Sequence, residues 1–220
     1  MNPSRPFDLA SNCAMARIAR SVVALSAVIT LSSGLATKAR ANTRLVRKLP
    51  AEVTAAINQQ IQYELDGAQE YLSLASTYYA KNLNGFGAWY TAQYVEELNH
   101  ARMMIFFLTD KDETPEIGAI SRPVINFSTA LDAATQSLTL EETQTERINK
   151  LYDLTVATNA RDAASFLLFF INEQVQEEAS FKNQVDKLNL AGDDRAALLA
   201  LDKDLGARVI PALFMPPPAP

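Results

Sequence analysis

Three residue types are scarce in this 220-residue chain, and each scarcity narrows what the protein can be. The single cysteine, Cys13, excludes an intrachain disulfide and a thiolate-rich metal site. Only seven glycines interrupt a sequence rich in Leu, Ala and Glu, which favours helices. The single histidine, His100, leaves most metal-ligand roles to oxygen. A net charge of −5 gives no basic footprint for nucleic acid, and the length suits one sizeable domain.

Residues 1–41 carry the pattern of a targeting segment rather than of a folded domain. Arginines precede an apolar run, Ser21–Ala36, and Ala39-Arg40-Ala41 supplies a small-x-small cleavage site. This order is typical of a secretory signal. Arginine and serine with a single acid, Asp8, also suit an organelle transit peptide. The apolar run is short for a membrane span, so we expect no stable membrane association.

This segment leaves the compartment open. It suggests export, to the periplasm or outside the cell, or import into an organelle; the protein is cytoplasmic if the segment is not a functional signal. The pattern is cleaner if translation starts at Met15 rather than Met1. Removing residues 1–41 discards Cys13 and leaves 15 basic and 24 acidic side chains, a net charge of −9. The remainder consists of a predicted domain, 42–210, and a Pro-rich extended tail, 211–220.

Beyond Thr43 the sequence predicts an all-α fold. Apolar residues recur every three or four positions in four stretches: 53–79, 86–107, 131–155 and 166–188. Short turns at 81–87 and 158–162 make the helices of each pair antiparallel. The aperiodic stretch 109–127 is long enough to cross the bundle, so the third helix should run parallel to the second.

The helix ends have their own signals. We expect Ser128 to cap the third helix and Gly192 to close the fourth in a left-handed conformation. A shorter fifth helix, 193–206, has an apolar side formed by Leu198, Leu201 and Leu205. That side has no place in a four-helix core, so we expect it to contact another chain.

Every long helix carries polar side chains within its apolar stripe. In the second helix they are Glu97 and His100, which share a face because they are three residues apart. The other helices supply Glu64, Glu141 and the pair Gln174 and Glu177. An isolated Glu-x-x-His is better explained as a core histidine with a satisfying hydrogen bond. Polar groups at mid-helix in all four helices, however, cost several kcal/mol each unless a cation compensates them.

The donor types indicate which cation. Carboxylates with a single imidazole suit iron or manganese better than structural zinc, which prefers thiolates and more histidines. Inward glutamates combined with Glu-x-x-His are a known arrangement of ferritin-like di-metal bundles. The sequence therefore predicts an oxygen-rich metal site inside the bundle.

Four strings resemble those of ferritins, specifically the haem-free bacterial type. They are Glu-Glu-x-x-His at 96–100, Leu-Thr-Asp at 108–110, Arg-Ile-Asn-Lys-Leu at 147–151, and Phe-Lys-x-x-x-Asp-Lys-Leu-x-Leu-Ala-Gly at 181–192. The resemblance extends from about Leu49 to Gly206. It implies a ferritin-like four-helix bundle with one long crossover plus a short fifth C-terminal helix. It also implies a homo-24-mer around a hollow interior, with the fifth helix at the fourfold axes and no haem.

The resemblance implies the ligands of an intra-subunit di-iron centre. One iron would be held by Glu64, Glu97 and His100. The second would share Glu97 as a bridge and bind Glu141, with Gln174 nearby. Because His100 is the only nitrogen side-chain ligand, we expect the second iron to be held more loosely.

Further residues match family positions around that centre. Tyr71 corresponds to a tyrosine that assists electron or proton transfer. A third, inner iron site would use Glu96, Glu173 and Glu177. Gln176 replaces a further glutamate of that set, which puts the site in doubt. Bacterioferritins and rubrerythrins have a second Glu-x-x-His in the last helix. The equivalent here is Glu173-x-x-Gln176 or Gln174-x-x-Glu177, neither of which has a histidine, so the chain departs from both groups.

The resemblance implies an iron-storage protein with ferroxidase activity. It would oxidise Fe(II) with O2 or H2O2 and store the product as ferric oxyhydroxide. Two alternatives remain open at this point. One is a storage shell with little oxidase activity. The other is a small DNA-protecting cage, although such cages place their ligands across a subunit interface and lack a fifth helix.

Overall fold

The computed structural model describes residues 48–123 and 126–216, so the predicted targeting segment lies outside the described residues. In that part of the chain the regular structure is entirely helical, as predicted. The helices are α1 (Ala51–Ala80), α2 (Asn84–Asp110), α3 (Ala130–Ala157), α4 (Arg161–Ala191) and α5 (Arg195–Leu205).

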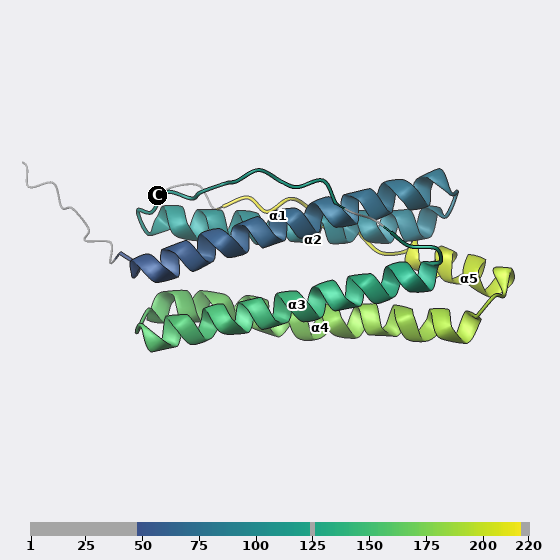
Figure 1. Cartoon of the computed structure of the whole chain (residues 1–220). Helices are drawn as coiled ribbons and strands as arrows, with labels where there is room; N and C mark the ends of the chain where they lie inside the picture. Colours follow the sequence, from purple (N-terminus) through teal and green to yellow (C-terminus); the bar gives the residue numbers. More distant parts are fainter. Residues whose placement is uncertain (1–47, 124–125, 217–220) are drawn as a thin grey trace, which may run out of the picture. The chain divides into compact units, whose positions relative to one another are not determined.

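The chain forms two antiparallel helix pairs joined by a long crossover (Figure 1). The crossover returns along α1, where two side chains hold its backbone. Asn58 accepts a hydrogen bond from the Glu116 amide at 2.8 Å, and Gln62 accepts one from the Gly118 amide at 3.1 Å. As a result α3 runs parallel to α2, which confirms the prediction from the length of the aperiodic stretch.

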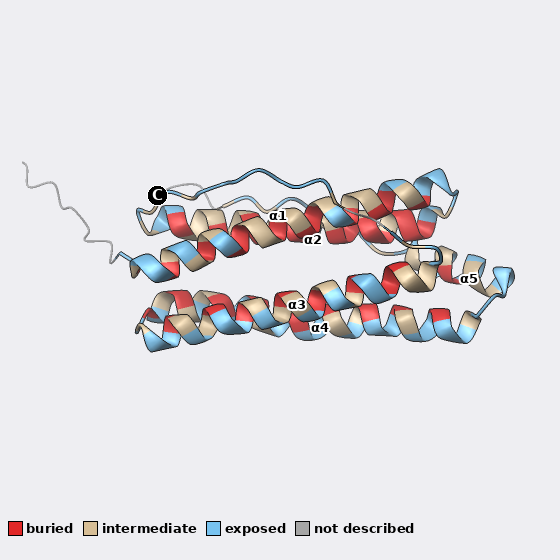
Figure 2. Cartoon of the chain, viewed as in Figure 1, coloured by how far each residue is buried: buried red, intermediate tan, exposed pale blue. Residues whose placement is uncertain are grey.

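The buried side of each helix faces the bundle interior, and its outer side is exposed (Figure 2). The apolar core is divided into two clusters. One is mainly aliphatic and includes Val53, Ile57, Ile61, Met104, Leu108, Ile148, Leu151 and Leu167. The other is mainly aromatic and includes Tyr71, Tyr78, Phe86, Trp89, Tyr90 and Phe181. The buried Glu64, Glu97, His100 and Glu141 belong to neither cluster.

The predicted turn 81–87 is shorter in the structure, because α2 already begins at Asn84. Gly85 and Gly87 are therefore helical residues. A Cβ on Gly85 would lie 1.5 Å from the Asp202 carbonyl oxygen, and one on Gly87 would lie 2.7 Å from the Tyr79 ring. These glycines permit close packing, whereas the sequence suggested that they form a turn.

The prediction that the apolar side of α5 has no place in the core of its own chain is wrong. Leu201 is buried in the aromatic cluster of the same chain, and Leu198 and Leu205 pack against it. The Asp202 carboxylate also accepts a hydrogen bond from the Phe86 amide at 2.9 Å. The helix thus closes the aromatic end of its own bundle, a long-range contact that the local sequence pattern did not reveal.

The caps differ slightly from those predicted. Thr129, not Ser128, caps α3: its hydroxyl accepts from the Asp132 amide, and Asp132 accepts from the Thr129 amide in return. Gly192 follows α4 with a positive φ of 52°, as expected for a glycine there, but its ψ of −130° differs from a left-handed helical residue.

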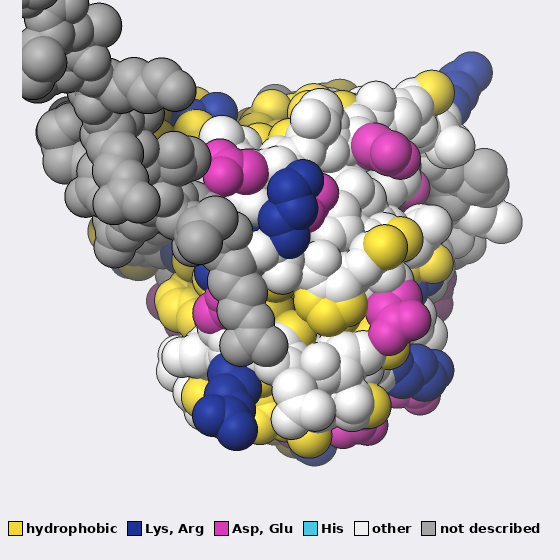
Figure 3. Space-filling view, turned by 90° about the vertical axis from the view of Figure 1, so that its left-hand side faces the viewer, with side chains coloured by type: hydrophobic (Ala, Val, Ile, Leu, Met, Phe, Trp, Pro, Cys, Tyr) yellow, Lys and Arg dark blue, Asp and Glu magenta, His cyan; other side chains and the backbone are white. Residues whose placement is uncertain are grey.

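Among the described residues, the end of the molecule viewed in Figure 3 shows no patch of a single charge. There, acidic, basic and hydrophobic side chains are interspersed. Lys111 and Asp162 form an ion pair that joins the end of α2 to the start of α4. None of the described helices is both long and apolar enough to cross a bilayer.

Candidate metal centre

The four long helices bring their buried polar residues together in the middle of the bundle. Glu64 comes from α1, Glu97 and His100 from α2, Glu141 from α3 and Gln174 from α4. Each residue is at most 5% exposed. Since helical residues three or four apart share a face, the stripe that would otherwise carry apolar side chains directs all five inwards.

Glu64, Glu97 and His100 form the tightest group. Each offers one ligand atom, and these atoms lie within 4.8 Å of one another. The Nδ1 atom of His100 lies 3.5 Å from Glu97 Oε2 and 3.8 Å from Glu64 Oε2. Among the described residues this is the group of three or more acidic, histidine or cysteine side chains close enough to hold a metal ion.

Glu173 fixes the orientation of the histidine ring. His100 Nε2 lies 2.7 Å from Glu173 Oε2, and this close contact with a carboxylate places Nδ1 on the side of Glu64 and Glu97. A carboxylate on the far nitrogen is the usual device that orients a metal-binding histidine and increases its basicity.

An unpaired atom in the same group also fits a cation. Glu97 Oε2 is buried and makes no hydrogen bond to any described residue. A buried carboxylate oxygen without a donor is costly unless a positive charge compensates it. Together with His100 Nδ1, once that nitrogen has lost its proton, this oxygen provides a donor set that suits iron or manganese.

The remaining predicted ligands lie on the other side of the bundle. The Tyr71 hydroxyl donates a hydrogen bond to Glu141 Oε1. The Gln174 amide donates to Glu141 Oε2 at 3.3 Å and to the Thr145 hydroxyl at 3.2 Å. The hydrogen bonds from Tyr71 and Gln174 therefore fix the position of the Glu141 carboxylate.

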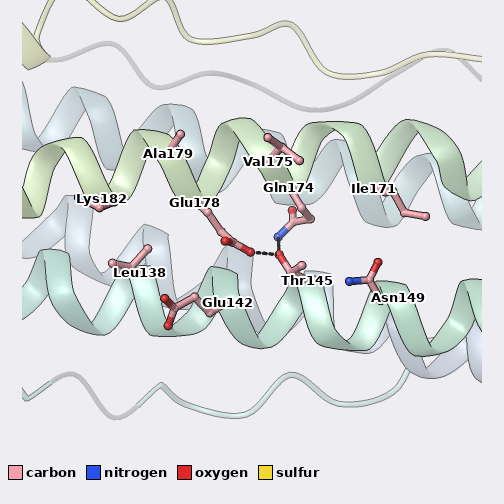
Figure 4. A pocket seen from close by; sticks show the side chains of 10 residues that line it. All are labelled: Leu138, Glu142, Thr145, Asn149, Ile171, Gln174, Val175, Glu178, Ala179 and Lys182. Carbon is pink, nitrogen blue, oxygen red and sulfur yellow. Dashed lines mark hydrogen bonds between the residues drawn. The ribbon is translucent and has the colours of Figure 1, made fainter.

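Thr145 and Gln174 also line a surface groove of about 540 Å³ between α3 and α4 (Figure 4). Thr145 donates a further hydrogen bond to Glu178 at 2.5 Å, so a continuous polar chain leads from the groove to Glu141. Gln174 therefore lies at the inner wall of the groove, although its side chain is buried.

Two glutamines that sequence reasoning missed hold Glu64. Gln60 donates to Glu64 Oε1 at 2.8 Å, and Gln144 donates to Glu64 Oε2 at 3.1 Å. Both are buried. Gln60 lies one turn before Glu64 and Gln144 one turn after Glu141, so the helical period would have placed them beside the site.

The three residues predicted for a third iron each contact a different partner. Glu173 binds His100, and Glu177 accepts a hydrogen bond from Gln93 at 2.8 Å. Glu96 pairs with Arg208 at 2.5 Å. The side chain of Gln176 is exposed.

Burial and mutual repulsion change the protonation of the central acids. Burial, reinforced by Glu97, raises the pKa of Glu64 well above its usual range. Burial and the charge of Glu141 likewise raise the pKa of Glu97. Burial raises the pKa of Glu141 to about 7, despite the hydrogen bonds from Tyr71 and Gln174.

The histidine responds in the opposite sense to burial. Burial alone would lower the pKa of His100, but the carboxylates of Glu173, Glu97 and Glu64 outweigh it and raise the pKa well above its usual range. The centre therefore retains protons when no other cation is present. A divalent metal ion can replace those protons, so metal binding releases them.

These features define a class of protein: a four-helix bundle with an internal group of carboxylates and one histidine that could hold a metal ion. Comparison with known proteins agrees. The sequence model of the protein family described as the ferritin-like domain matches residues 54–191 of this chain. The chain is 34% identical over 162 residues to a bacterial non-heme ferritin of Staphylococcus epidermidis, which covers 73% of this chain and 96% of the relative. A bacterial non-heme ferritin of Staphylococcus aureus is 31% identical over 160 residues.

Solved structures show the same relationship. An open-pore ferritin from Archaeoglobus fulgidus aligns with a TM-score of 0.73 and 34% identity, covering 74% of this chain and all of that chain. A humanized archaeal ferritin aligns with a TM-score of 0.74 and 33% identity. This chain belongs to the ferritin family of iron-storage proteins.

Proposed function

We propose that the protein is a ferroxidase that oxidises Fe(II) at a di-iron centre inside each subunit and stores the ferric product. The observation that carries this proposal is the buried group of Glu64, Glu97 and His100, in which His100 Nδ1 faces both carboxylates and one Glu97 oxygen has no hydrogen bond. The family relationship supports iron as the metal that this group binds.

In this proposal Glu64, Glu97 and His100 bind the first Fe(II). Glu97 also bridges to the second, which binds Glu141 with Gln174 nearby. Carboxylates stabilise Fe(III) more than Fe(II), so these ligands favour oxidation. The two electrons released reduce O2 with two protons to H2O2, or reduce H2O2 with two protons to two water molecules.

The surrounding residues keep the ligands in place during this reaction. Glu173 holds His100 with Nδ1 towards the metal, and Gln60 and Gln144 fix Glu64. Tyr71, hydrogen-bonded to Glu141, is well placed to assist proton or electron transfer. The acids that lose protons when iron binds are then available as ligands and bases.

Storage requires an assembly with an interior. We propose a homo-24-mer in which the ferric product collects as hydrated oxide. In support, the chain aligns over the full length of the ferritin subunit from Archaeoglobus fulgidus. The excess of acidic side chains would attract iron cations to such a shell. Size-exclusion chromatography with light scattering measures the subunit number, and a particle near twelve subunits would favour the small DNA-protecting cage instead.

Fe(II) oxidation by the metal-free protein tests the enzyme directly. Oxygen consumption should exceed that of protein-free buffer, and Glu97→Ala should reduce the excess rate by at least about tenfold, because it removes the proposed bridging ligand. The matched control is Glu142→Ala, which removes an exposed glutamate from α3. Oxidation no faster than in buffer would leave a storage shell that accepts iron oxidised elsewhere.

We also propose that residues 1–41 act as a targeting segment that is removed. N-terminal sequencing of the native protein is the test. A mature N-terminus near residue 42 supports the proposal, whereas an intact Met1 contradicts it and favours a cytoplasmic location.

A further inference from the structure

The segment after α5 does not leave the bundle but follows α2 (Figure 1). Asn99 holds its backbone with both ends of the amide: Nδ2 donates to the Ala212 carbonyl at 3.0 Å, and Oδ1 accepts from the Phe214 amide at 2.6 Å. Arg102 Nε donates to the Phe214 carbonyl at 2.9 Å. Residues 207–215, the C-terminal strap, are therefore attached to α2 by specific hydrogen bonds.

This attachment places a cation beside the acids next to the metal centre. Arg208 Nη2 lies 2.5 Å from Glu96 Oε2, and its guanidinium lies 5.0 Å from the centre of the Trp89 ring. The side chains of Arg208 and Glu96 are each only 22% exposed. Glu96 and Arg208 both act electrostatically on Glu177, so the pair lies near the other acids of this group.

Each nearby carboxylate has a different polar partner. Glu173 Oε2 lies 2.7 Å from His100 Nε2, Glu177 accepts a hydrogen bond from the Gln93 amide, and Glu96 pairs with Arg208. The sequence has glutamine at the exposed position 176, so a fourth carboxylate is lacking there. Burial and the charge of Glu96 raise the pKa of Glu177. The positive charge of Arg208 acts in the opposite direction and lowers it.

We propose that Arg208 takes the place of a third metal ion in the inner acidic cluster of Glu96, Glu173 and Glu177. The inference rests on the proposed two-metal centre and limits each subunit to those two metal positions. A metal ion at Glu96 would compete with the guanidinium for Oε2 and would be repelled by its positive charge. The cation supplied by the strap thus prevents iron from being retained beside the centre.

Crystals of the full-length protein soaked with Zn²⁺, a redox-inert probe, test this proposal by anomalous scattering. In the wild-type protein we expect Zn²⁺ at Glu64, Glu97 and His100 and at Glu141, but none at Glu96. In Arg208→Gln we expect one additional ion between Glu96, Glu173 and Glu177, which raises the number per subunit from two to three. Arg208→Lys retains a cation and should keep two.

The control is Arg195→Gln, which removes an equal charge from an exposed position at the start of α5 and should leave the count at two. An ion at Glu96 in the wild-type protein overturns the proposal, even if Arg208→Gln does not fold. An unchanged inner cluster in folded Arg208→Gln overturns it too. Absence of Zn²⁺ from Glu64, Glu97 and His100 refutes the two-metal centre instead. The two proposals can therefore fail separately, one at Glu96 and the other at the central group.

Discussion

Replacing Glu141 by glutamine should stabilise the metal-free protein at pH 7.5 and destabilise it at pH 4. Glu141 is 1% exposed, and burial raises its pKa from 4.5 to about 7. The folded protein therefore retains a proton that an unfolded chain has lost. Because the folded-state pKa is the higher one, this group's contribution is fully present below pH 4.5. It is lost as the pH rises through about 7.

The size of the effect follows from the two pKa values. One pH unit corresponds to about 1.4 kcal/mol, so a rise from 4.5 to about 7 removes about 3 kcal/mol of stability from the metal-free protein. Glu141→Gln cannot ionise and escapes this loss. It also loses the 3.3 Å hydrogen bond from Gln174, which costs about 1 kcal/mol. The variant should be about 2 kcal/mol more stable at pH 7.5 and about 1 kcal/mol less stable at pH 4, where the wild-type carboxyl is mostly protonated in both states.

Urea unfolding of the metal-free proteins measures both differences, at one fixed subunit concentration because assembly affects stability. The fluorescence of Trp89, the only tryptophan, reports on the unfolding. The control Glu142→Gln changes an exposed neighbour and should match the wild type at both pH values. Saturating Zn²⁺ at pH 7.5 should reverse the order, since the variant lacks a proposed ligand. If the variant and the control unfold alike at both pH values, Glu141 does not carry a retained proton.

Three further substitutions test the neighbours of the centre. Glu173→Gln should weaken Zn²⁺ binding about ten- to a hundredfold, as measured by chelator competition, because it no longer orients His100. Tyr71→Phe removes the donor to Glu141 and should slow Fe(II) oxidation about tenfold; an unchanged initial rate contradicts its proposed role. Gly85→Ala should lower stability by at least about 2 kcal/mol in urea unfolding, because its Cβ meets the Asp202 backbone. The control Gly118→Ala meets only the flexible end of Gln62 and should cost less.

Much of the fold could be predicted because its signals are local and repeated. The apolar period indicated four long helices, and the length of the aperiodic stretch indicated the direction of the third. The same period located Glu64, Glu97, His100 and Glu141, because a polar residue in an apolar stripe is conspicuous. Repetition over four helices made a shared site a better explanation than separate exceptions.

The parts that sequence reasoning missed depend on contacts between distant residues. Gly85 was assigned to a turn, but it is a packing residue because Asp202 approaches it. The partner of Glu96 is Arg208, which lies 112 positions away in a segment that carries no periodic signal. Glu173 was assigned to a third metal site from family resemblance, whereas its contact is with His100. No local sequence pattern specifies which of several acids a single arginine or histidine will contact.

The geometry also gives a physical reason why the two proposed metal positions should differ. At the first position, the His100 nitrogen can join two carboxylates, and Glu97 has an oxygen without a hydrogen bond. At the second, Glu141 already accepts hydrogen bonds from Tyr71 and Gln174, which a metal ion there would have to replace. Because the pKa values of Glu64, Glu97 and Glu141 are all raised, a metal must displace protons at both positions. The smaller ligand set and the existing hydrogen bonds therefore lead us to expect that the second position holds its metal more loosely, which suits iron that is passed on to storage.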